Sequence, residues 1–390
     1  MRGKSFRLTF VWASLNKRCF AEQTTFQKGE KGSFRVARAM TITMKNGKLG
    51  YAVVGLGVGK AHVQAAAEYD KCELVAVCDL IREKLDKVVE NYPGTKTYTE
   101  FDELIRDDEV DIISICLPSA MHADFAVRAM EAGKHVLIEK PIDITVEAAK
   151  RIEEARVRTG MTAGVIHQNR NNAVMKPIKE AIDAGRLGKL VLGTFAVKWY
   201  RDAHYYMGWH GTWEMDGGGS LMNQAVHTVD LMQWLMGDVV SVHSTMGIYD
   251  HDIATEDMTA SVITFKSGAA ATFVSTTCAY PGISTDIQLY GTGGTIEADA
   301  DILKRWKLRD ADDEDEEEEE MLEMYGGGNR ACEKADPTLV TGHASMVRNM
   351  VDAVANGTDP QILPTEAIKS VRIVNAIYES ARTGKTIYFD

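Results

Sequence analysis

A lysine follows a carboxylate at the end of an apolar, strand-like run in the stretch HVLIEKP, residues 135–141. In a parallel sheet, Glu139 and Lys140 would lie just past the strand, at the edge where ligands bind, and Pro141 would stiffen the chain there. An ammonium group at that edge can hold a substrate hydroxyl and, when desolvated, exchange a proton with it. A structural Glu–Lys pair is the alternative that these residues leave open.

A histidine with polar neighbours at helical spacing lies in GGGSLMNQAVHTVDLMQWLMG, residues 217–237. Asn223, His227 and Asp230 are spaced by four and three residues, so in a helix they would lie along one face. Histidine titrates near neutral pH, which suits it to accept the proton of an alcohol while a hydride leaves the same carbon. A hydrogen-bonded core histidine is the alternative.

A glycine-rich turn joins a strand to an alanine-rich helix in GLGVGKAH, residues 55–62. Gly55 would permit the tight turn, and Gly57 would let the backbone approach a pyrophosphate at the helix N-terminus. Asp79 ends the next apolar strand, where an acid accepts hydrogen bonds from the adenosine ribose and repels a 2′-phosphate. We therefore predict NAD as the cofactor, and Arg82 keeps NADP open as the alternative.

Aromatic side chains and histidines gather in one short segment further along the chain. They are His204, Tyr205, Tyr206, Trp209, His210 and Trp213. The cluster is typical of an aromatic loop over a sugar-sized pocket, and surface packing is the alternative. The ten histidines do not otherwise fall at metal-ligand spacings, and the six cysteines include no CxxC pair. We predict neither a metal site nor a disulfide framework.

The patterning predicts two domains that would position these residues. From Leu49 onward, continuously apolar strands alternate with helices, which indicates a doubly wound parallel sheet, a Rossmann domain over residues 47–169. Beyond it, strands alternate apolar and polar residues and predict a largely antiparallel open sheet in a second, α+β domain over residues 170–390. We expect a helix at 221–236 capped by Ser220, and a final pair of helices at 344–355 and 365–383.

Charge is distributed unevenly along the 390 residues, whose formal net charge is -12. Residues 1–46 hold ten Lys or Arg against two Glu, and we expect a poorly ordered basic extension, with a working start at Met40 or Met44 or a weak secretory signal as alternatives. The run DADDEDEEEEE, residues 310–320, supplies ten carboxylates. We interpret it as a solvated, self-repelling surface loop rather than a site for a metal or a basic partner.

The composition also excludes some partners. A chain this acidic is a poor ligand for nucleic acid. No apolar run approaches the roughly 18 residues that cross a bilayer. We expect a soluble, cytoplasmic protein that binds no membrane.

Four segments together resemble the glucose–fructose oxidoreductase and inositol dehydrogenase family, Gfo/Idh/MocA. They are GLGVGKAH, LPSAMH with Pro118 and His122, AGKHVLIEKP, and GGGSLMNQAVHTVDLMQWLMG. The resemblance covers essentially residues 48–390. It implies a Rossmann domain joined to an open sheet through which members form homodimers or homotetramers. It also implies hydride transfer between NAD(P) and a ring carbon of a sugar, inositol or related polyol.

The resemblance implies roles for individual residues. Lys140 would contact substrate and nicotinamide, and His227 would be the general base. Many family dehydrogenases have aspartate four residues before that histidine; here Asn223 can hydrogen-bond the substrate but cannot relay a proton. The expected cofactor-binding residues are Gly55, Gly57, Val58, Gly59, Asp79, Arg82, Pro118, His122, Glu139 and Lys140, and the expected substrate-binding residues are Asn223, Trp209, His210 and Tyr206.

Two relatives of different function are alternatives to a dehydrogenase. One is a redox-neutral glycosidase that keeps NAD bound and oxidises its substrate only transiently. The other is a non-catalytic NAD-binding sensor, which tolerates loss of the catalytic lysine and histidine. Because both residues are present in this chain, the dehydrogenase is the leading hypothesis.

Overall fold

The computed structural model describes residues 26–28, 34–36, 47–336 and 338–389. The chain divides into two units, residues 1–42 and 43–390. In the first unit, β1 (Phe26–Lys28) pairs antiparallel with β2 (Phe34–Val36). The rest of the expected basic extension lies outside the described residues. Among the helices that are described, none is both long and apolar enough to cross a membrane.

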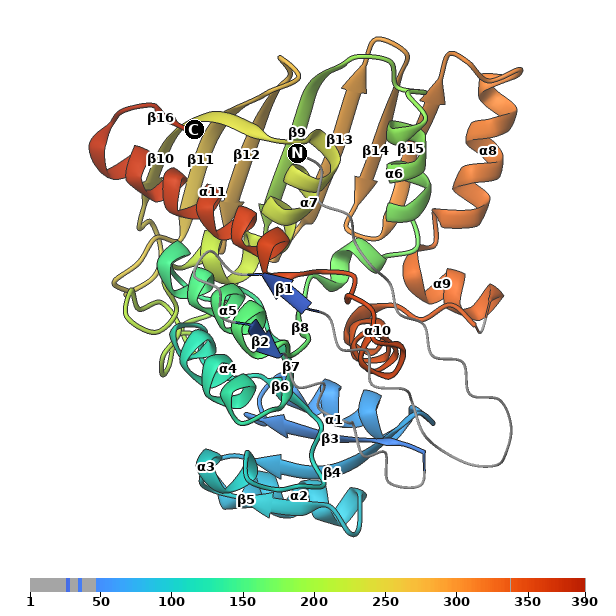
Figure 1. Cartoon of the computed structure of the whole chain (residues 1–390). Coiled ribbons are helices and arrows are strands. Elements are labelled where there is room, and N and C mark those ends of the chain that lie inside the picture. The colour runs from blue at the N-terminus through green and yellow to red at the C-terminus, as the bar shows by residue number, and fades with distance from the viewer. Residues whose placement is uncertain (1–25, 29–33, 37–46, 337, 390) are drawn as a thin grey trace. The chain divides into compact units, whose positions relative to one another are not determined.

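A six-stranded parallel sheet forms the first half of the larger unit, with the strand order β5-β4-β3-β6-β7-β8 (Figure 1). Its two central strands, β3 and β6, are wholly buried, as continuously apolar runs predict. The order reverses between β3 and β6, and the crevice at such a switch point is where doubly wound sheets bind ligands. The strands are β3 (Leu49–Val54), β4 (Cys72–Cys78), β5 (Lys96–Tyr98), β6 (Ile112–Ile115), β7 (His135–Ile138) and β8 (Ala163–Val165).

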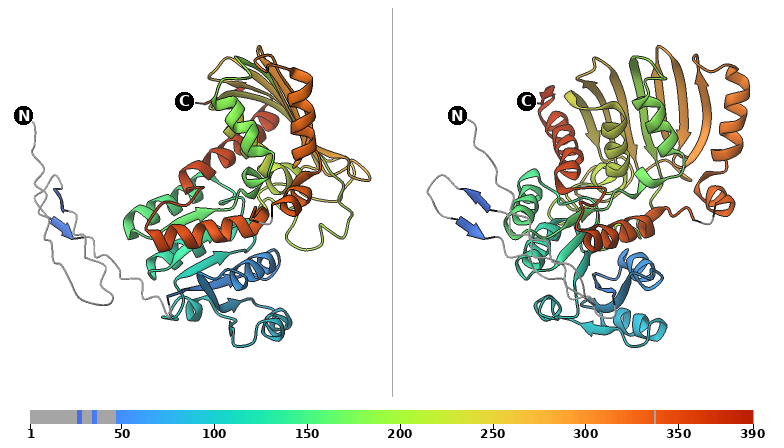
Figure 2. Two further views of the ribbon diagram at one scale, coloured as in Figure 1. Left: turned by 90° about the vertical axis from the view of Figure 1, so that its right-hand side faces the viewer. Right: turned by 45° about the vertical axis from the view of Figure 1, so that its right-hand side comes forward.

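Helices cover this sheet, and one of them comes from the far end of the chain. The local helices are α1 (Gly59–Ala67), α2 (Arg82–Asn91), α3 (Phe101–Leu104), the 3-10 turn η1 (Ser119–Met121), α4 (His122–Glu131) and α5 (Val146–Thr159). α10 (Gly342–Asn356) packs against α1 (Figure 2), where Asp352 accepts hydrogen bonds from Tyr69 and Lys71. The predicted second domain thus contributes a helix to the first.

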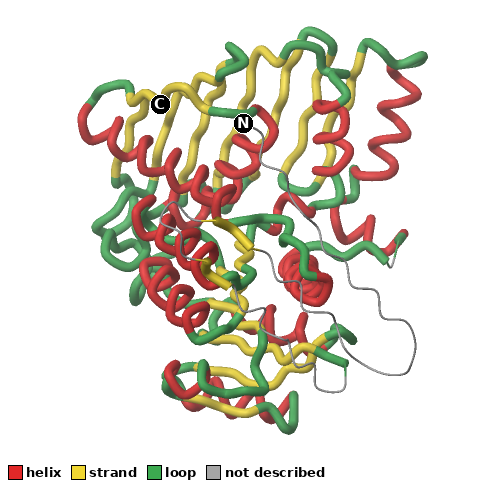
Figure 3. The backbone as a smooth tube through the Cα atoms, viewed as in Figure 1, coloured by secondary structure: helices red, strands yellow, loops and turns green. Residues whose placement is uncertain are grey.

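An eight-stranded sheet forms the second half, in the order β15-β14-β13-β9-β12-β11-β10-β16. Only β9 and β12 pair in parallel; the other neighbours are antiparallel. Both sheets confirm the predicted fold class (Figure 3). The strands are β9 (Leu190–Lys198), β10 (Val239–Gly247), β11 (Met258–Phe265), β12 (Ala270–Thr276), β13 (Ser284–Gly291), β14 (Gly294–Asp299), β15 (Ile302–Leu308) and β16 (Ile387–Tyr388).

Three helices lie on one face of this sheet and bury its apolar side chains. They are α6 (Met175–Asp183), α7 (Val226–Met236) and α11 (Pro364–Thr383) (Figure 1). Alternate strand residues such as Phe195, Ile263 and Phe273 pack against them in one core. Apolar and polar residues alternate along these strands, and this alternation therefore predicted which residues face the helices.

The acidic run is not a loop, because most of it forms α8 (Glu314–Tyr325) beside β15. Asp313 caps this helix by accepting hydrogen bonds from the backbone N–H groups of Asp315 (3.0 Å) and Glu316 (3.1 Å). Carboxylates in a first turn are also favoured by the helix dipole. The short helix α9 (Gly328–Ala335) follows.

The prediction of a loop was wrong because it counted charges only within the run. Arg186, from a segment far away in sequence, forms an ion pair with Glu317 (2.8 Å), and Lys307 of β15 pairs with Glu318 (2.9 Å). The next turns of α8 carry apolar side chains that pack on the core: Met321, Leu322 and Tyr325. Packing and distant cations together offset the repulsion.

We expect Asp313→Ala to loosen the first turn of α8, because two N–H groups lose their acceptor. Loss of a helix cap costs about 1 kcal/mol, so hydrogen exchange of the first-turn amides should accelerate about fivefold. Asp312→Ala is the matched control, since it removes the same charge and Asp312 makes no hydrogen bond with any described residue. Equal acceleration in both variants would contradict the capping role.

Candidate active site

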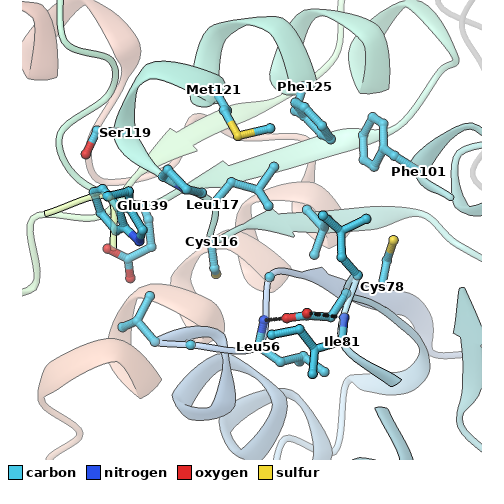
Figure 4. Close-up of a pocket in the computed structure, with 18 of the residues that line it drawn as sticks. Leu56, Cys78, Ile81, Phe101, Cys116, Leu117, Ser119, Met121, Phe125 and Glu139 are labelled. Atoms are coloured by element: carbon cyan, nitrogen blue, oxygen red, sulfur yellow. Dashed lines mark hydrogen bonds between the residues drawn. The ribbon is translucent and has the colours of Figure 1, made fainter. Parts of the chain in front are cut away.

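A cavity of about 800 Å³ opens at the carboxyl ends of the parallel strands (Figure 4). Its lining comes from both halves of the larger unit. The Rossmann domain supplies residues 54–58, 78–81, 116–119 and 139–140, and the second domain supplies Tyr205, Trp209, His210 and Asn223. The cavity therefore joins the glycine turn to the lysine and to the aromatic segment.

The glycine turn fits the phosphates of a dinucleotide. Gly55 has a φ of 85°, and a Cβ atom there would lie 2.2 Å from the carbonyl oxygen of Cys116. At Gly57 a Cβ would meet nothing within 4 Å, so the backbone faces open space. α1 begins at Gly59 behind Val58 and has no side-chain cap. The first backbone N–H groups of α1 can therefore donate hydrogen bonds to an anion.

Asp79 is held at the end of β4, beside the glycine turn. Its two carboxylate oxygens accept hydrogen bonds from the backbone N–H groups of Leu56 (2.7 Å) and Ile81 (2.9 Å) (Figure 4). The cation beside it is Lys84, whose Nζ atom lies 3.3 Å from Oδ2, whereas Arg82 is absent from the cavity lining. Arg82 was chosen for closeness in sequence to Asp79, and the structure places it at the first position of α2.

His122 supports the cavity from behind rather than lining it. Its ring nitrogens lie 2.7 Å from the carbonyl oxygen of Pro141 and 2.8 Å from that of Leu117. The imidazole thereby connects the turn after β6 to the turn after β7. Pro118, which precedes η1, does line the cavity.

The Glu139 carboxylate is bound by two histidines and not by the lysine side chain. Its Oε1 atom lies 2.9 Å from His62 Nε2 and 3.1 Å from His343 Nε2. Oε2 accepts the backbone N–H of Lys140 (3.0 Å). Burial alone would raise the pKa of Glu139, but the hydrogen bonds from His343 and His62 hold it well below its usual value. The group is therefore an anion.

The Lys140 side chain crosses to the second domain. Its Nζ atom donates a hydrogen bond to the carbonyl oxygen of Asn223 (2.9 Å). Burial lowers the pKa of this ammonium, and the negative charges of Glu139 and Asp216 only partly oppose the effect. A buried amine with a lowered pKa is suited to exchange a proton with a bound hydroxyl.

The helix expected at 221–236 begins instead as a π-helical turn, η3 (Ser220–Ala225), and continues as α7. Ser220 is not its cap, because the hydroxyl pairs with Ser275 (3.0 Å). The carboxylate of Glu256 takes that place, accepting the N–H groups of Gly219 (2.9 Å) and Leu221 (2.8 Å). Sequence analysis missed Glu256, which lies on a distant loop and belongs to no motif.

Asn223, His227 and Asp230, which were predicted to lie along one helix face, have different surroundings. Asp230 is occupied by a bidentate pair with Arg170 (2.7 and 2.8 Å). The wider π-turn removes Asn223 from the regular α-helical register. His227 is buried, its Nδ1 atom has no hydrogen-bond partner among the described residues, and it is absent from the cavity lining. Burial, and then the charge of Lys140, lower the pKa of His227 well below its usual value.

The amide of Asn223 is the centre of a polar cluster on the cavity wall. Its nitrogen donates to Asp216 Oδ1 and to His210 Nδ1 (3.1 Å), and its oxygen accepts from the hydroxyl of Tyr205 (3.1 Å). The rings of Tyr205 and His210 stack with centroids 4.5 Å apart. This side of the cavity is therefore rigid and rich in hydrogen-bonding groups.

The aromatic segment places three of its members on the cavity: Tyr205, Trp209 and His210. Tyr206 was predicted to bind substrate, but its hydroxyl donates to Thr277 (2.8 Å) and it lies outside the lining. The ring of Tyr206 packs edge-on against that of Tyr205, with centroids 5.1 Å apart, so of the two tyrosines Tyr205 is the one on the cavity.

An apolar wall at the other end of the cavity was also missed. Figure 4 labels Phe101, Met121 and Phe125 along it. The guanidinium of Arg128 lies 5.1 Å from the Phe101 ring centroid and 5.2 Å from that of Phe125. These residues come from α3, η1 and α4, and no motif connects them in the sequence.

Glu256 should make stability depend on pH. Burial raises its pKa to about 7, so the folded state binds the proton more tightly than the unfolded state. The resulting stabilisation is complete below pH 4.5 and is lost as the pH rises to 7, a loss of about 3 kcal/mol. Glu256→Gln cannot ionise, so its melting temperature relative to the wild type should be higher at pH 8 than at pH 5.

The matched control is Glu318→Gln. Burial would raise the pKa of Glu318, but its partner Lys307 lowers it below the ordinary value, so its titration falls below this pH range. The melting temperature of the control should therefore differ from that of the wild type by the same amount at pH 5 and at pH 8. A constant difference for Glu256→Gln as well would show that Glu256 does not titrate between pH 5 and pH 8.

Two family models match the chain. One is described as "Oxidoreductase family, NAD-binding Rossmann fold" and matches residues 49–167. The other, "GFO/IDH/MocA C-terminal domain", matches residues 175–297. Together they cover more than half of the chain.

Individual relatives agree with these models. The crystal structure of the WlbA dehydrogenase from Bordetella pertussis, in complex with NADH and UDP-GlcNAcA, has 29% identity and a TM-score of 0.80, covering 89% of this chain and 99% of that one. The 1-carboxy-3-chloro-3,4-dihydroxycyclohexa-1,5-diene dehydrogenase of Comamonas testosteroni is 31% identical over 221 residues. The match spans only 55% of each of the two chains. D-Apiose dehydrogenase of Paraburkholderia graminis is 23% identical over 90% of this chain and 92% of its own.

The predicted resemblance and the predicted NAD-binding domain are confirmed by these matches. The glycine turn, Asp79 and the lysine after β7 all line the one cavity described above. This chain is a member of the Gfo/Idh/MocA oxidoreductase family, with an NAD-binding Rossmann domain followed by the family's C-terminal domain.

Proposed function

We propose that the protein is an NAD-dependent dehydrogenase that transfers a hydride between nicotinamide and a ring carbon of a sugar or related polyol. The observation that carries the proposal is the half-buried Lys140 ammonium, which lines the cavity where the two domains meet. D-Apiose dehydrogenase and, at 26% identity, myo-inositol 2-dehydrogenase of Thermotoga maritima are relatives that support this substrate class.

The cofactor is assigned to residues already described. The turn at Gly55 and Gly57 and the start of α1 would hold the pyrophosphate, and Asp79 would accept hydrogen bonds from the adenosine ribose. When bound, NAD supplies the acceptor for the hydride. The lowered pKa of Glu139 places a fixed negative charge beside Lys140, which favours the charged form of the lysine.

Lys140 and His227 have different roles in removing the proton from the substrate hydroxyl. Lys140 lines the cavity and His227 does not, so we assign the direct contact with the reacting hydroxyl to Lys140. The hydroxyl proton leaves as the hydride leaves the same carbon, and the final acceptor is His227, which its lowered pKa keeps neutral. The Asn223 amide, held by Asp216 and His210, would orient the substrate by hydrogen bonding.

Absorbance at 340 nm tests the proposal. The full-length protein would be mixed with NAD or NADP and with inositols, free sugars, sugar acids and nucleotide sugars. We expect NADH to form with at least one compound. If no compound changes the absorbance at 340 nm while NAD is bound to the purified protein, the result would refute the dehydrogenase and favour the redox-neutral glycosidase.

Lys140→Met should lower kcat at least about 100-fold, because one positioned proton-transfer group contributes 100-fold or more. NAD affinity, measured by fluorescence titration, should stay within about threefold, since an interaction needed only for chemistry leaves binding unchanged. Lys84→Met, beside Asp79, is the comparison: it should weaken NAD binding and spare kcat at saturating NAD. Loss of NAD binding in Lys140→Met would show that the lysine serves the cofactor instead.

The pH profile of kcat/KM should report His227. In the direction of alcohol oxidation a base must be unprotonated, so activity should fall as the pH drops through the pKa of His227. This acid limb should lie below pH 6.5, because burial and the charge of Lys140 lower that pKa. His227→Asn should remove the limb from the residual activity; a limb that persists unchanged would assign it to another group.

A further inference from the structure

A second cation, Arg201, contacts the substrate side of the cavity wall through Tyr205, although Arg201 itself is not among the lining residues. The guanidinium of Arg201 is 5.1 Å from the ring centroid of Trp199 and 5.2 Å from that of Tyr205. It donates hydrogen bonds to a backbone carbonyl and to Oε1 of Gln224, both at 3.0 Å. All of these partners are neutral. Among the described residues, no carboxylate forms an ion pair with Arg201.

The carboxylates of this region are already occupied. Glu139 is shared by His62 and His343. Asp216 accepts the side-chain amide of Asn223 and a backbone N–H group. Both acids are at most 2% exposed, so neither is free to turn toward the guanidinium. The charge of Arg201 is therefore balanced by no side chain that the structure describes.

Arg201 is within electrostatic reach of the reacting position. Its positive charge is one of the groups that lower the pKa of Lys140. It also contacts two residues that bound the substrate side: Tyr205, which lines the cavity, and Gln224, which follows the lining residue Asn223. The two cations repel each other, and Arg201 forms no ion pair with a described carboxylate, so a substrate anion beside the guanidinium would relieve that repulsion.

We propose that the substrate carries a carboxylate beside the oxidised ring carbon, as a uronic acid does, and that Arg201 binds it. This inference rests on the proposed dehydrogenase function. A carboxylate would replace the neutral acceptors of the guanidinium with charge-assisted hydrogen bonds, which are roughly twice as strong. A phosphate monoester is a weaker fit, because it brings a charge of about -1.5 to -2 to a single guanidinium.

Matched substrate pairs test the proposal. The pairs are glucose with glucuronate, N-acetylglucosamine with N-acetylglucosaminuronate, and the UDP-linked forms of both, with glucose 6-phosphate added. For at least one pair, kcat/KM of the acid should exceed that of its neutral partner by about 30-fold, the effect of a hydrogen bond to a charged group. Arg201→Gln should remove this advantage and leave kcat/KM of the neutral partner within about threefold.

Arg151→Gln is the control for net charge. Arg151 is exposed, pairs with Asp124 on α4 and is not among the residues that line the cavity, so the ratio of acid to neutral substrate should not change. An equal loss for both members of a pair in Arg201→Gln would overturn the proposal, because it would show that Arg201 only supports Tyr205. A preference for the neutral sugar or for the phosphate would overturn it too.

Binding separates failure of this inference from failure of the proposed reaction. Calorimetry would measure the same compounds against the complex of full-length Lys140→Met with NADH. One outcome is that an acid binds, that Arg201→Gln abolishes its binding, and that the wild type oxidises no compound. This outcome would support the anion site and refute the dehydrogenase. If neutral sugars are oxidised and the acids have no higher kcat/KM, the result would support the dehydrogenase and refute the anion site. Absence of binding for every acid overturns the inference.

Discussion

The hydrogen bond from Lys140 to the carbonyl oxygen of Asn223 joins the two domains at the cavity. A buried ammonium without an acceptor costs several kcal/mol, so the end of β7 and the turn η3 must meet for the lysine to remain there. Each end of this bond is fixed by a buried acid. Glu139 accepts the backbone N–H of Lys140, and Glu256 holds the start of η3.

These two acids show how partners decide the charge of a buried carboxylate. Both are about 2% exposed, and burial raises the pKa of each. Glu139 receives two imidazoles and its pKa falls well below normal. Glu256 receives only backbone N–H groups and hydroxyls, and its pKa rises to about 7. A buried glutamate is thus a fixed anion at position 139, next to the lysine, whereas at position 256, at the start of η3, it titrates near neutral pH.

Sequence patterns predicted the parts of the fold that depend on near neighbours. The buried strands, the glycine turn and the placing of Lys140 after β7 follow from apolar runs and a local motif. The partners could not be predicted, because His343 and Arg186 reach Glu139 and Glu317 from distant segments. Helical spacing predicted that Asp230 shares a helix face with His227, but it could not predict that Arg170 pairs with that acid. The π-turn depends on Glu256, a contact that no periodicity encodes.

Asn223 connects the local chemistry to the charge of the whole cavity. An aspartate at this position would put a carboxylate on the wall beside Lys140. With an amide there, the side chain at 223 instead donates an N–H group to Asp216, which is buried and accepts it with one oxygen. The carboxylate of this cluster is therefore that of Asp216, which is not among the residues that line the cavity. Such a wall suits the acidic substrate that we propose, because that substrate would supply the anion that the side chain at 223 does not.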